Sequence, residues 1–212
     1  MKRRLNNFQD KLLKLFNKRN KALYLRLLKN IKNNINNKDI NSVIKKEISI
    51  LNKKQQEAVK DSLSYAYIYI NKDKRKALKI LKENWNDLNY SDRLYKDKIK
   101  LKRTLIREIS KGINNEDNNE KIINSVVKRL DISINNAKRL VNTEMTAVMN
   151  RAVIDKAEKE GHSKFIFIAI IDDRTSDICK ELNGEVFDIK DFKIGVNAGP
   201  IHPNCRSRIE SF

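Results

Sequence analysis

Apolar residues recur at steps of three and four along the first 160 residues, and the positions between them are mostly Lys, Arg and Asn. This spacing places the apolar side chains on one face of a helix. It predicts helical segments at residues 5–35, 40–51, 63–70 and 78–88. The Asn-rich stretch 33–37 is a turn between the first two. The stretch 65–70 has a pattern that also suits a strand, but its polar, proline-free flanks favour a helix.

Further helices are predicted at residues 91–112, at 122–130 and from there to Gly161. Ser91 is a good N-cap for the first of these, and Gly112 is a plausible C-terminal stop. Asp131 or Ser133 caps the last, long helix. The polar stretch between Gly112 and residue 122 is a loop.

The pattern changes after Gly161. Residues 164–171 are a run of Ile and Phe typical of a buried strand, and residues 185–189 predict a second short strand. A turn at 172–176 and one helical turn at 179–182 lie between them. The predicted fold class is therefore α+β: a mainly α-helical, elongated body with a small C-terminal α+β module that contains a short sheet.

Composition divides the 212-residue chain at the same place. Four of the five Gly, both Pro, both Cys and both His lie after residue 160. The first 160 residues carry 39 Lys and Arg against 19 Asp and Glu, whereas the last 52 carry 7 against 8. We predict a basic helical N-terminal region at 1–89, a helical core at 90–161 and a small α+β Cys/His module at 162–212.

The formal net charge of +19 predicts that the protein acts close to polyanions. The 27 Asn, beside many Lys and Ile, offer a second interpretation. This composition is typical of an AT-rich genome. In that case part of the positive charge reflects genome composition, and the Lys-rich surface is solvated and has no nucleic-acid partner. Charge alone leaves both interpretations open.

No membrane partner is expected. The longest apolar run, residues 165–171, is far shorter than the roughly 20 residues of a transmembrane helix. The basic residues 1–4 are not followed by an uninterrupted apolar stretch, so no signal peptide is predicted. We expect synthesis in a reducing cytosol.

The sequence contains no Gly-rich phosphate loop, no Ser nucleophile elbow and no His-Glu-x-x-His, and its two His leave little room for a catalytic triad. Asp172 and Asp173 are adjacent carboxylates, but at a turn such residues more often act as hydrogen-bonding caps. We therefore predict no catalytic residue and no enzymatic activity.

The most specific local feature is Cys179 followed by His202 and Cys205. Three interpretations fit this spacing. The three side chains can supply soft ligands to zinc, with an Asp or water as the fourth ligand. The cysteines can instead be reduced and buried beside a histidine that is bonded to backbone. The third interpretation, a Cys179–Cys205 disulfide, is disfavoured by the expected compartment.

Arginines near the carboxylate-rich turn are expected to form bidentate pairs, so Arg206 is predicted to bind Asp172 or Asp173. Trp85 and Tyr90 are interpreted as packing anchors rather than a base-stacking platform.

Several motifs occur together in a fixed order. They are Trp85, Tyr90-Ser-Asp-Arg-Leu94, Asn142-Thr-Glu144, Asn150-Arg-Ala152, Asp173-Arg-Thr175, Cys179, Leu182-Asn-Gly-Glu-Val-Phe187 and Pro200-Ile-His-Pro-Asn-Cys-Arg206. In this order they resemble the phage Mu F-like minor head protein family, which comprises phage head morphogenesis proteins. The resemblance covers residues 85–212. It implies structural motif roles for eight residues: Glu144, Arg151, Asp172, Asp173, Arg174, Gly184, Pro203 and Arg206.

Three positions depart from the family pattern. Two of its cysteines are Ser176 and Ser207 here, and the Arg of its Arg-Thr-Glu motif is Asn142. If the family's Cys and His residues hold a metal, this chain keeps at most Cys179, His202 and Cys205. Zinc is thus a possible cofactor that the resemblance does not require.

The resemblance implies a minor structural protein of a tailed bacteriophage head, associated with the portal protein inside the capsid. It implies roles in head morphogenesis and in DNA handling at ejection, with capsid or scaffold protein as further partners and packaged DNA bound by non-specific electrostatics. The location is the virion, and the host cytoplasm during assembly. The alternative is a free DNA-binding or metal-dependent, nuclease-like accessory protein.

Overall fold

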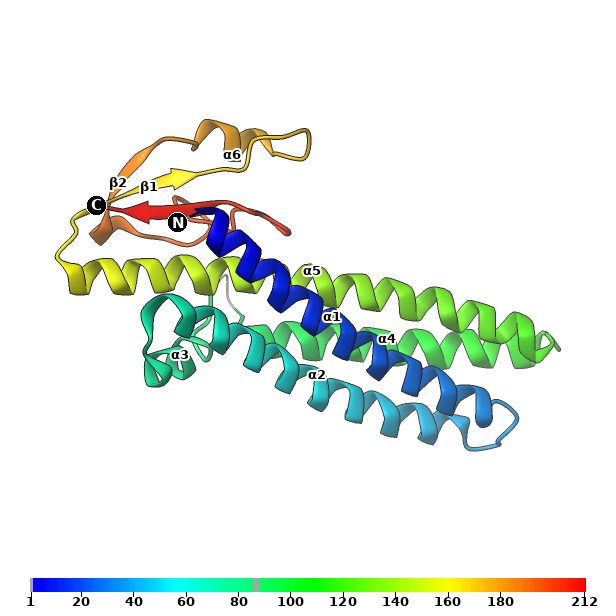
Figure 1. Ribbon diagram of the computed structural model, residues 1–212. Coiled ribbons are helices and arrows are strands. Elements are labelled where there is room, and N and C mark those ends of the chain that lie inside the picture. Colours follow the sequence, from blue (N-terminus) through cyan, green and yellow to red (C-terminus); the bar gives the residue numbers. More distant parts are fainter. Residues whose placement is uncertain (1, 86–87) are drawn as a thin grey trace. The chain divides into compact units, whose positions relative to one another are not determined.

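The structure is a computed structural model that describes residues 2–85 and 88–212. The elements in chain order are α1 (Lys2–Asn33), α2 (Ile40–Asn71), α3 (Lys74–Ile80), α4 (Tyr90–Asn114), α5 (Asn119–Glu160), β1 (Lys164–Ile168), α6 (Asp177–Glu181), β2 (Val186–Asp188) and β3 (Arg208–Ser211). The predicted fold class is confirmed, because long helices precede a small antiparallel sheet (Figure 1). None of the described helices combines the length and the apolar character needed to cross a membrane.

The chain forms two compact units, and each is assembled from separated segments. One unit combines the start of α1 with Lys60–Tyr90 and Arg139–Phe212. The other combines Lys14–Val59 with Ser91–Lys138. The long helices α1, α2 and α5 contribute to both units. The division into regions 1–89, 90–161 and 162–212 stays a prediction.

The second unit is a bundle in which segments of α1, α2, α4 and α5 lie side by side (Figure 1). Its core is a continuous cluster of aliphatic residues from all four segments, including Leu27, Ile44, Leu105 and Val126. Within the unit the Lys98 side chain is only 2% exposed. It donates to Tyr24 Oη at 2.8 Å, to Ser133 Oγ at 3.2 Å and to the Asp97 carboxylate at 2.6 Å.

Several helix boundaries predicted in this unit are wrong. The predicted short helix and the long helix after it are one helix, α5, which begins at Asn119. Neither Asp131 nor Ser133 caps a helix there, because Ser133 lies inside α5 and its hydroxyl binds Tyr24 and Lys98.

Gly112 is a packing residue and not a helix stop. It lies inside α4, which begins at Tyr90, before the predicted cap Ser91, and continues to Asn114. A Cβ atom at Gly112 would lie 2.5 Å from Cγ1 of Ile122, so only glycine allows α4 and α5 to approach this closely.

The segments predicted at 40–51 and 63–70 are also a single helix, α2, and the helical interpretation of 65–70 is confirmed. After α2 the chain turns at Lys72, and Asp73 caps α3 by accepting from the backbone N–H of Lys76 at 2.9 Å. The helix predicted over 78–88 is wrong in extent, because α3 ends at Ile80. Trp85 instead forms an isolated bridge with Leu88.

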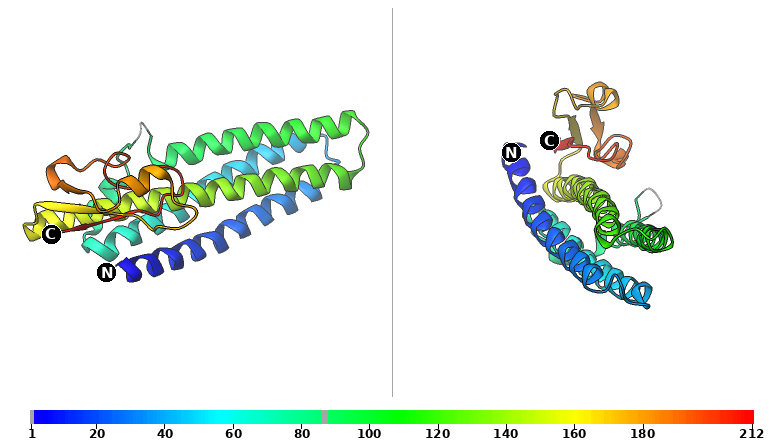
Figure 2. Two further views of the ribbon diagram at one scale, coloured as in Figure 1. Left: turned by 90° about the horizontal axis from the view of Figure 1, so that it is seen from above. Right: turned by 90° about the vertical axis from the view of Figure 1, so that its right-hand side faces the viewer.

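The C-terminal sheet has the strand order β2-β1-β3, with β1 antiparallel to both neighbours. The sheet lies along the end of α5 (Figures 1 and 2). Phe165 and Ile209 of the sheet share a core cluster with Val153 and Ile154 of α5. The C-terminal module therefore rests on the long helix α5.

Two sequence predictions about the sheet are corrected. The strand predicted over 164–171 ends at Ile168, because the backbone N–H of Ala169 donates to Asn183 Oδ1 rather than to a strand. The strand β3 was not predicted from the sequence.

Candidate functional site

The candidate site is built on α6, a short helix that presents Cys179 toward the sheet. Ser176 is its N-cap and accepts from the backbone N–H of Cys179 at 3.4 Å. Cys179 is 2% exposed and packs with Phe167, Ala169 and Cys205 in a small apolar cluster. The helix ends at Glu181, and three residues later Gly184 adopts a positive φ of 94° and donates its N–H to the carbonyl oxygen of Phe167 at 2.9 Å.

The structure brings together the three residues that the sequence singles out. Cys179 Sγ lies 3.7 Å from Cys205 Sγ and 3.5 Å from His202 Nε2. The ligand atoms of all three residues lie within 4.8 Å of one another. Both cysteines are free and buried.

His202 is oriented by the turn that contains it. Its Nδ1 lies 2.9 Å from the carbonyl oxygen of Pro203. Because a carbonyl only accepts, Nδ1 carries the hydrogen, and the lone pair of Nε2 faces Cys179. This tautomer suits a histidine that accepts from a thiol, and it equally suits a metal ligand.

Burial raises the pKa of the Cys179 thiol, and the adjacent Cys205 raises it further. Hydrogen bonds with Ser176 and Ser207 act in the opposite direction. The two serines that replace family cysteines therefore both lie beside Cys179. The cluster thus consists of two thiols, an imidazole and two hydroxyls.

Two of the three separations between the ligand atoms fit a zinc ion. A tetrahedral zinc with its usual bond lengths separates two sulfur ligands by about 3.8 Å and a sulfur and a nitrogen ligand by about 3.6 Å. The separations of Cys179 from Cys205 (3.7 Å) and from His202 (3.5 Å) match these edges, whereas His202 and Cys205 lie within 4.8 Å of each other. Cys179, His202 and Cys205 would hold the ion, which would cross-link α6 to the loop before β3.

Next to the cluster, a bidentate ion pair ties the turn after β1 to the loop before β3. Arg206 donates from Nη1 and Nη2 to the two oxygens of Asp172, at 2.8 Å and 2.6 Å. The Arg206 guanidinium holds the pKa of the Asp172 carboxyl well below its usual range. Of the two predicted partners, Asp172 is therefore the one that Arg206 binds, whereas Asp173 is exposed.

The same turn also involves Arg174. Its backbone N–H donates to Asp172 at 3.0 Å, and its own side chain is 72% exposed. Asp172 thus acts as a turn cap, as its position predicts.

Polar residues of α5 hold the loops of this site, and their importance was missed in the sequence. Asn150 donates to the carbonyls of Gly199 and Ser207 at 2.8 Å and 3.2 Å, and it accepts from the N–H of Ile209 at 3.3 Å. Thr146 donates to the carbonyl of Cys205 at 3.0 Å.

A third contact of this kind comes from Thr143, whose hydroxyl accepts from the N–H of Asn204 at 3.0 Å. Thr143, Thr146 and Asn150 are spaced by three and four residues and are buried. A buried polar stripe on an otherwise apolar helix face is the signal that could have revealed them.

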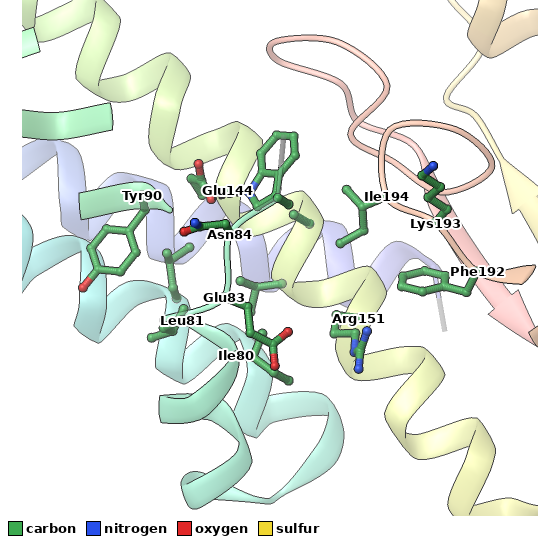
Figure 3. Close-up of a pocket in the computed structure, with 14 residues that line it drawn as sticks. Ile80, Leu81, Glu83, Asn84, Tyr90, Glu144, Arg151, Phe192, Lys193 and Ile194 are labelled. Carbon is green, nitrogen blue, oxygen red and sulfur yellow. Dashed lines mark hydrogen bonds between the residues drawn. The ribbon is translucent and has the colours of Figure 1, made fainter. Parts of the chain in front are cut away.

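Glu144 and Arg151 belong to a different set of contacts. The Glu144 carboxylate accepts from Trp85 Nε1 at 2.8 Å. Arg151 binds Asp155 at 3.2 Å, and Asp155 also accepts from the buried Tyr67 hydroxyl at 2.6 Å. Trp85, Glu144 and Arg151 line a cavity in the first unit (Figure 3).

A family model described as phage Mu protein F like protein matches residues 100–210, just over half of the chain. The matched stretch begins in α4 and ends in β3, so it contains the cysteine–histidine cluster and the α5 residues that hold it. No curated protein and no solved structure matches the chain.

Proposed function

Because the chain belongs to the phage Mu protein F like family, whose members act in phage head morphogenesis, we propose that it is a minor structural protein of a tailed bacteriophage head. It associates with the portal protein inside the capsid, contacts capsid or scaffold protein during assembly in the host cytoplasm, and remains in the virion. The observation that carries this proposal is the family match over residues 100–210.

The structure of the matched stretch supports a binding rather than a catalytic role. The polar groups of the site are used in holding the module together: Arg206 closes on Asp172, and Asn150 binds three backbone groups. Such a module presents a fixed surface to a partner.

Contact with packaged DNA is the second part of the proposal. Lys96, Lys100, Arg103 and Arg107 line a shallow groove along α4 in the second unit. Their spacing of four, three and four residues corresponds to steps of about 6, 4.5 and 6 Å along a helix. A row of cations at this spacing suits the regularly spaced phosphates of a DNA strand, without any preference for sequence.

Portal association is tested by co-expressing the tagged chain with the portal protein of the same phage, and separately with its capsid protein. We expect the portal protein to co-purify as a ring and the chain to be detected by mass spectrometry in gradient-purified heads. Absence of the chain from both procapsids and mature heads would refute the proposal.

A further inference from the structure

The two cysteines of the chain lie in contact inside the C-terminal module. Cys179 belongs to α6, and Cys205 lies in the loop before β3, 26 positions later in the sequence. Their sulfur atoms are 3.7 Å apart, and both thiols are free. Because the sulfurs of a disulfide are about 2.05 Å apart, a bond between these two requires them to approach by only about 1.7 Å.

Hydrogen bonds from other residues fix the positions of both cysteines. The backbone N–H of Cys179 donates to the Ser176 hydroxyl at 3.4 Å. The backbone N–H of Cys205 donates to the carbonyl of His202 at 3.0 Å, and its own carbonyl accepts from Thr146 at 3.0 Å. The two thiols are therefore held side by side by the fold, without a metal or a bond between them.

The two thiols lack the further sulfur ligands that a complete Cys-based zinc site would have. Ser176 and Ser207 stand at the positions of two family cysteines, and both form hydrogen bonds with Cys179. Phe167 and Ala169 pack around the cysteine pair. The group is thus a buried dithiol, and the characteristic reaction of adjacent thiols is oxidation to a disulfide.

We propose that Cys179 and Cys205 are a redox-sensitive pair, which hydrogen peroxide closes to a disulfide after the phage particle has left its host. In the reducing cytosol the two thiols persist, and in the oxidising medium outside the cell the bond forms. The proposal rests on the proposed function for this timing alone. The bond joins α6 covalently to the loop before β3 and so reinforces the module in the released particle.

The reaction consumes one molecule of hydrogen peroxide and both thiols. The first sulfur attacks a peroxide oxygen, so that an S–O bond forms, the O–O bond breaks, and the leaving oxygen departs as water with the thiol proton. The second sulfur then attacks this sulfenic acid. The S–S bond forms, the S–O bond breaks, and the hydroxide leaves as water with the second thiol proton. Both sulfurs are oxidised and the peroxide is reduced, so no other reactant is needed.

Burial selects the oxidant. Cys179 is 2% exposed and Cys205 is fully buried, so a reagent close to water in size is needed to reach them in the folded protein. His202, which is half-buried and lies 3.5 Å from Cys179 Sγ, is the polar neighbour through which such a molecule approaches. A bulky maleimide should therefore label the thiols only after the chain is unfolded in urea.

The test treats the reduced full-length chain with millimolar hydrogen peroxide and follows its intact mass. We expect the monomer to lose two hydrogen atoms within hours and to regain them with dithiothreitol. The melting temperature should rise by roughly 5–10 °C, because the cross-link lowers the entropy of the unfolded chain.

Cys205→Ser is the matched control, because it keeps Cys179 but removes its partner. Peroxide should neither take two hydrogen atoms from this variant nor raise its melting temperature. Circular dichroism shows that the variant is folded, and Cys179→Ser, which keeps the other thiol, repeats the test independently.

Three results with the purified chain would overturn the proposal. They are two intact thiols after peroxide treatment, a disulfide that joins two chains instead of closing within one, and one stoichiometric zinc that protects both thiols from peroxide. In gradient-purified particles that are alkylated before reduction, we expect the bonded pair, and two alkylated thiols would overturn the timing. Absence of the chain from particles would refute the proposed function but would leave the results with the purified chain unchanged, so the two proposals fail separately.

Discussion

A single buried side chain, Asn150, binds backbone groups from three places in the C-terminal module. Its amide meets the carbonyls of Gly199 and Ser207 and the N–H of Ile209. Gly199 is required at this point, because a Cβ atom there would lie 2.8 Å from the carbonyl oxygen of Ser207. Side chains that saturate buried backbone groups are costly to remove, because each group left unpaired keeps its desolvation penalty.

Asn150→Ala should therefore destabilise the protein by roughly 3 kcal/mol, the sum expected for buried backbone groups that lose their partner. The free energy of unfolding is measured by urea denaturation, followed by circular dichroism. Asn135→Ala removes an exposed amide from the same helix and should change stability by less than about 0.5 kcal/mol. Equal effects of the two changes would contradict the role assigned to Asn150.

The Asp172–Arg206 pair predicts a pH dependence. Arg206 lowers the pKa of Asp172, so the folded state favours the ionised carboxylate. This contribution to stability is fully present above the ordinary aspartate pKa of about 3.9 and is lost as the pH falls below it. Asp172→Asn should lower the melting temperature at pH 7, and the difference from the wild type should shrink below about pH 4.

Asp173→Asn is the matched control for this experiment, because Asp173 is the exposed neighbour of Asp172. Melting curves between pH 3 and pH 7 compare the two variants. A difference between Asp172→Asn and the wild type that stays constant over this range would show that the ion pair does not carry the effect.

At the scale of elements, the sequence predicts the helices and strands that are indicated by residues within them or next to them in the chain. The Ile- and Phe-rich run gives β1, and the helical turn predicted at 179–182 is found as α6, which begins two residues earlier at Asp177. The predicted break near Ser133 failed for a non-local reason. A serine before an apolar run has the appearance of a cap, but here its hydroxyl is bound by Tyr24 and Lys98 of other helices. No pattern near residue 133 contains that information.

The missed strand β3 has a similar cause. Its first residue, Arg208, is charged yet only 4% exposed, and burial lowers its pKa to about 10. A charged residue beside Ile209 does not suggest a buried strand. Its place is set by pairing with Ile168 of β1 and by the hydrogen bond that the backbone N–H of Ile209 donates to Asn150 Oδ1. Both are long-range contacts.

Within the candidate site, the residue types and their order along the sequence indicated which side chains lie together in the structure. Cys179, His202 and Cys205 converge, as does Arg206 on Asp172. Two of the three ligand separations fit zinc, yet α5 already holds the same loops through Thr146 and Asn150. We therefore expect the module to fold without metal.

His202→Ala should destabilise the module by about 1–3 kcal/mol, as expected for the loss of a half-buried side chain that is hydrogen-bonded to Cys179 and Pro203, and should leave it folded. Thermal melts with and without a chelator, combined with metal analysis, test this expectation. One stoichiometric zinc whose removal unfolds the module would show instead that the metal holds it together.

At the scale of the whole molecule, charge is unevenly distributed along the chain. The excess of Lys and Arg lies in the first 160 residues, while the last 52 are close to neutral. The sequence alone leaves two explanations, a surface selected for DNA and a compositional bias toward Lys. The structure adds a distinction between basic side chains, because those at Lys96, Lys100, Arg103 and Arg107 share a groove on α4.

Whether these four side chains bind DNA can be tested by removing their charges. Changing Lys96, Lys100, Arg103 and Arg107 together to Gln should weaken binding to duplex DNA of any sequence. If all four contact phosphates, the slope of log affinity against log salt concentration should fall by about 3–4, since each contact contributes about 0.9. Fluorescence anisotropy with two unrelated duplexes over a range of salt concentrations measures the slope.

The matched control neutralises four exposed lysines with nearly the same spacing on α1: Lys11, Lys14, Lys18 and Lys21. It removes the same charge from the same molecule. If the α4 groove binds DNA, the control should change the slope by about 1 or less, the value for a single phosphate contact. Equal changes in the two variants would mean that the positive charge acts as a diffuse, composition-driven surface, and that the groove on α4 has no special part in binding DNA.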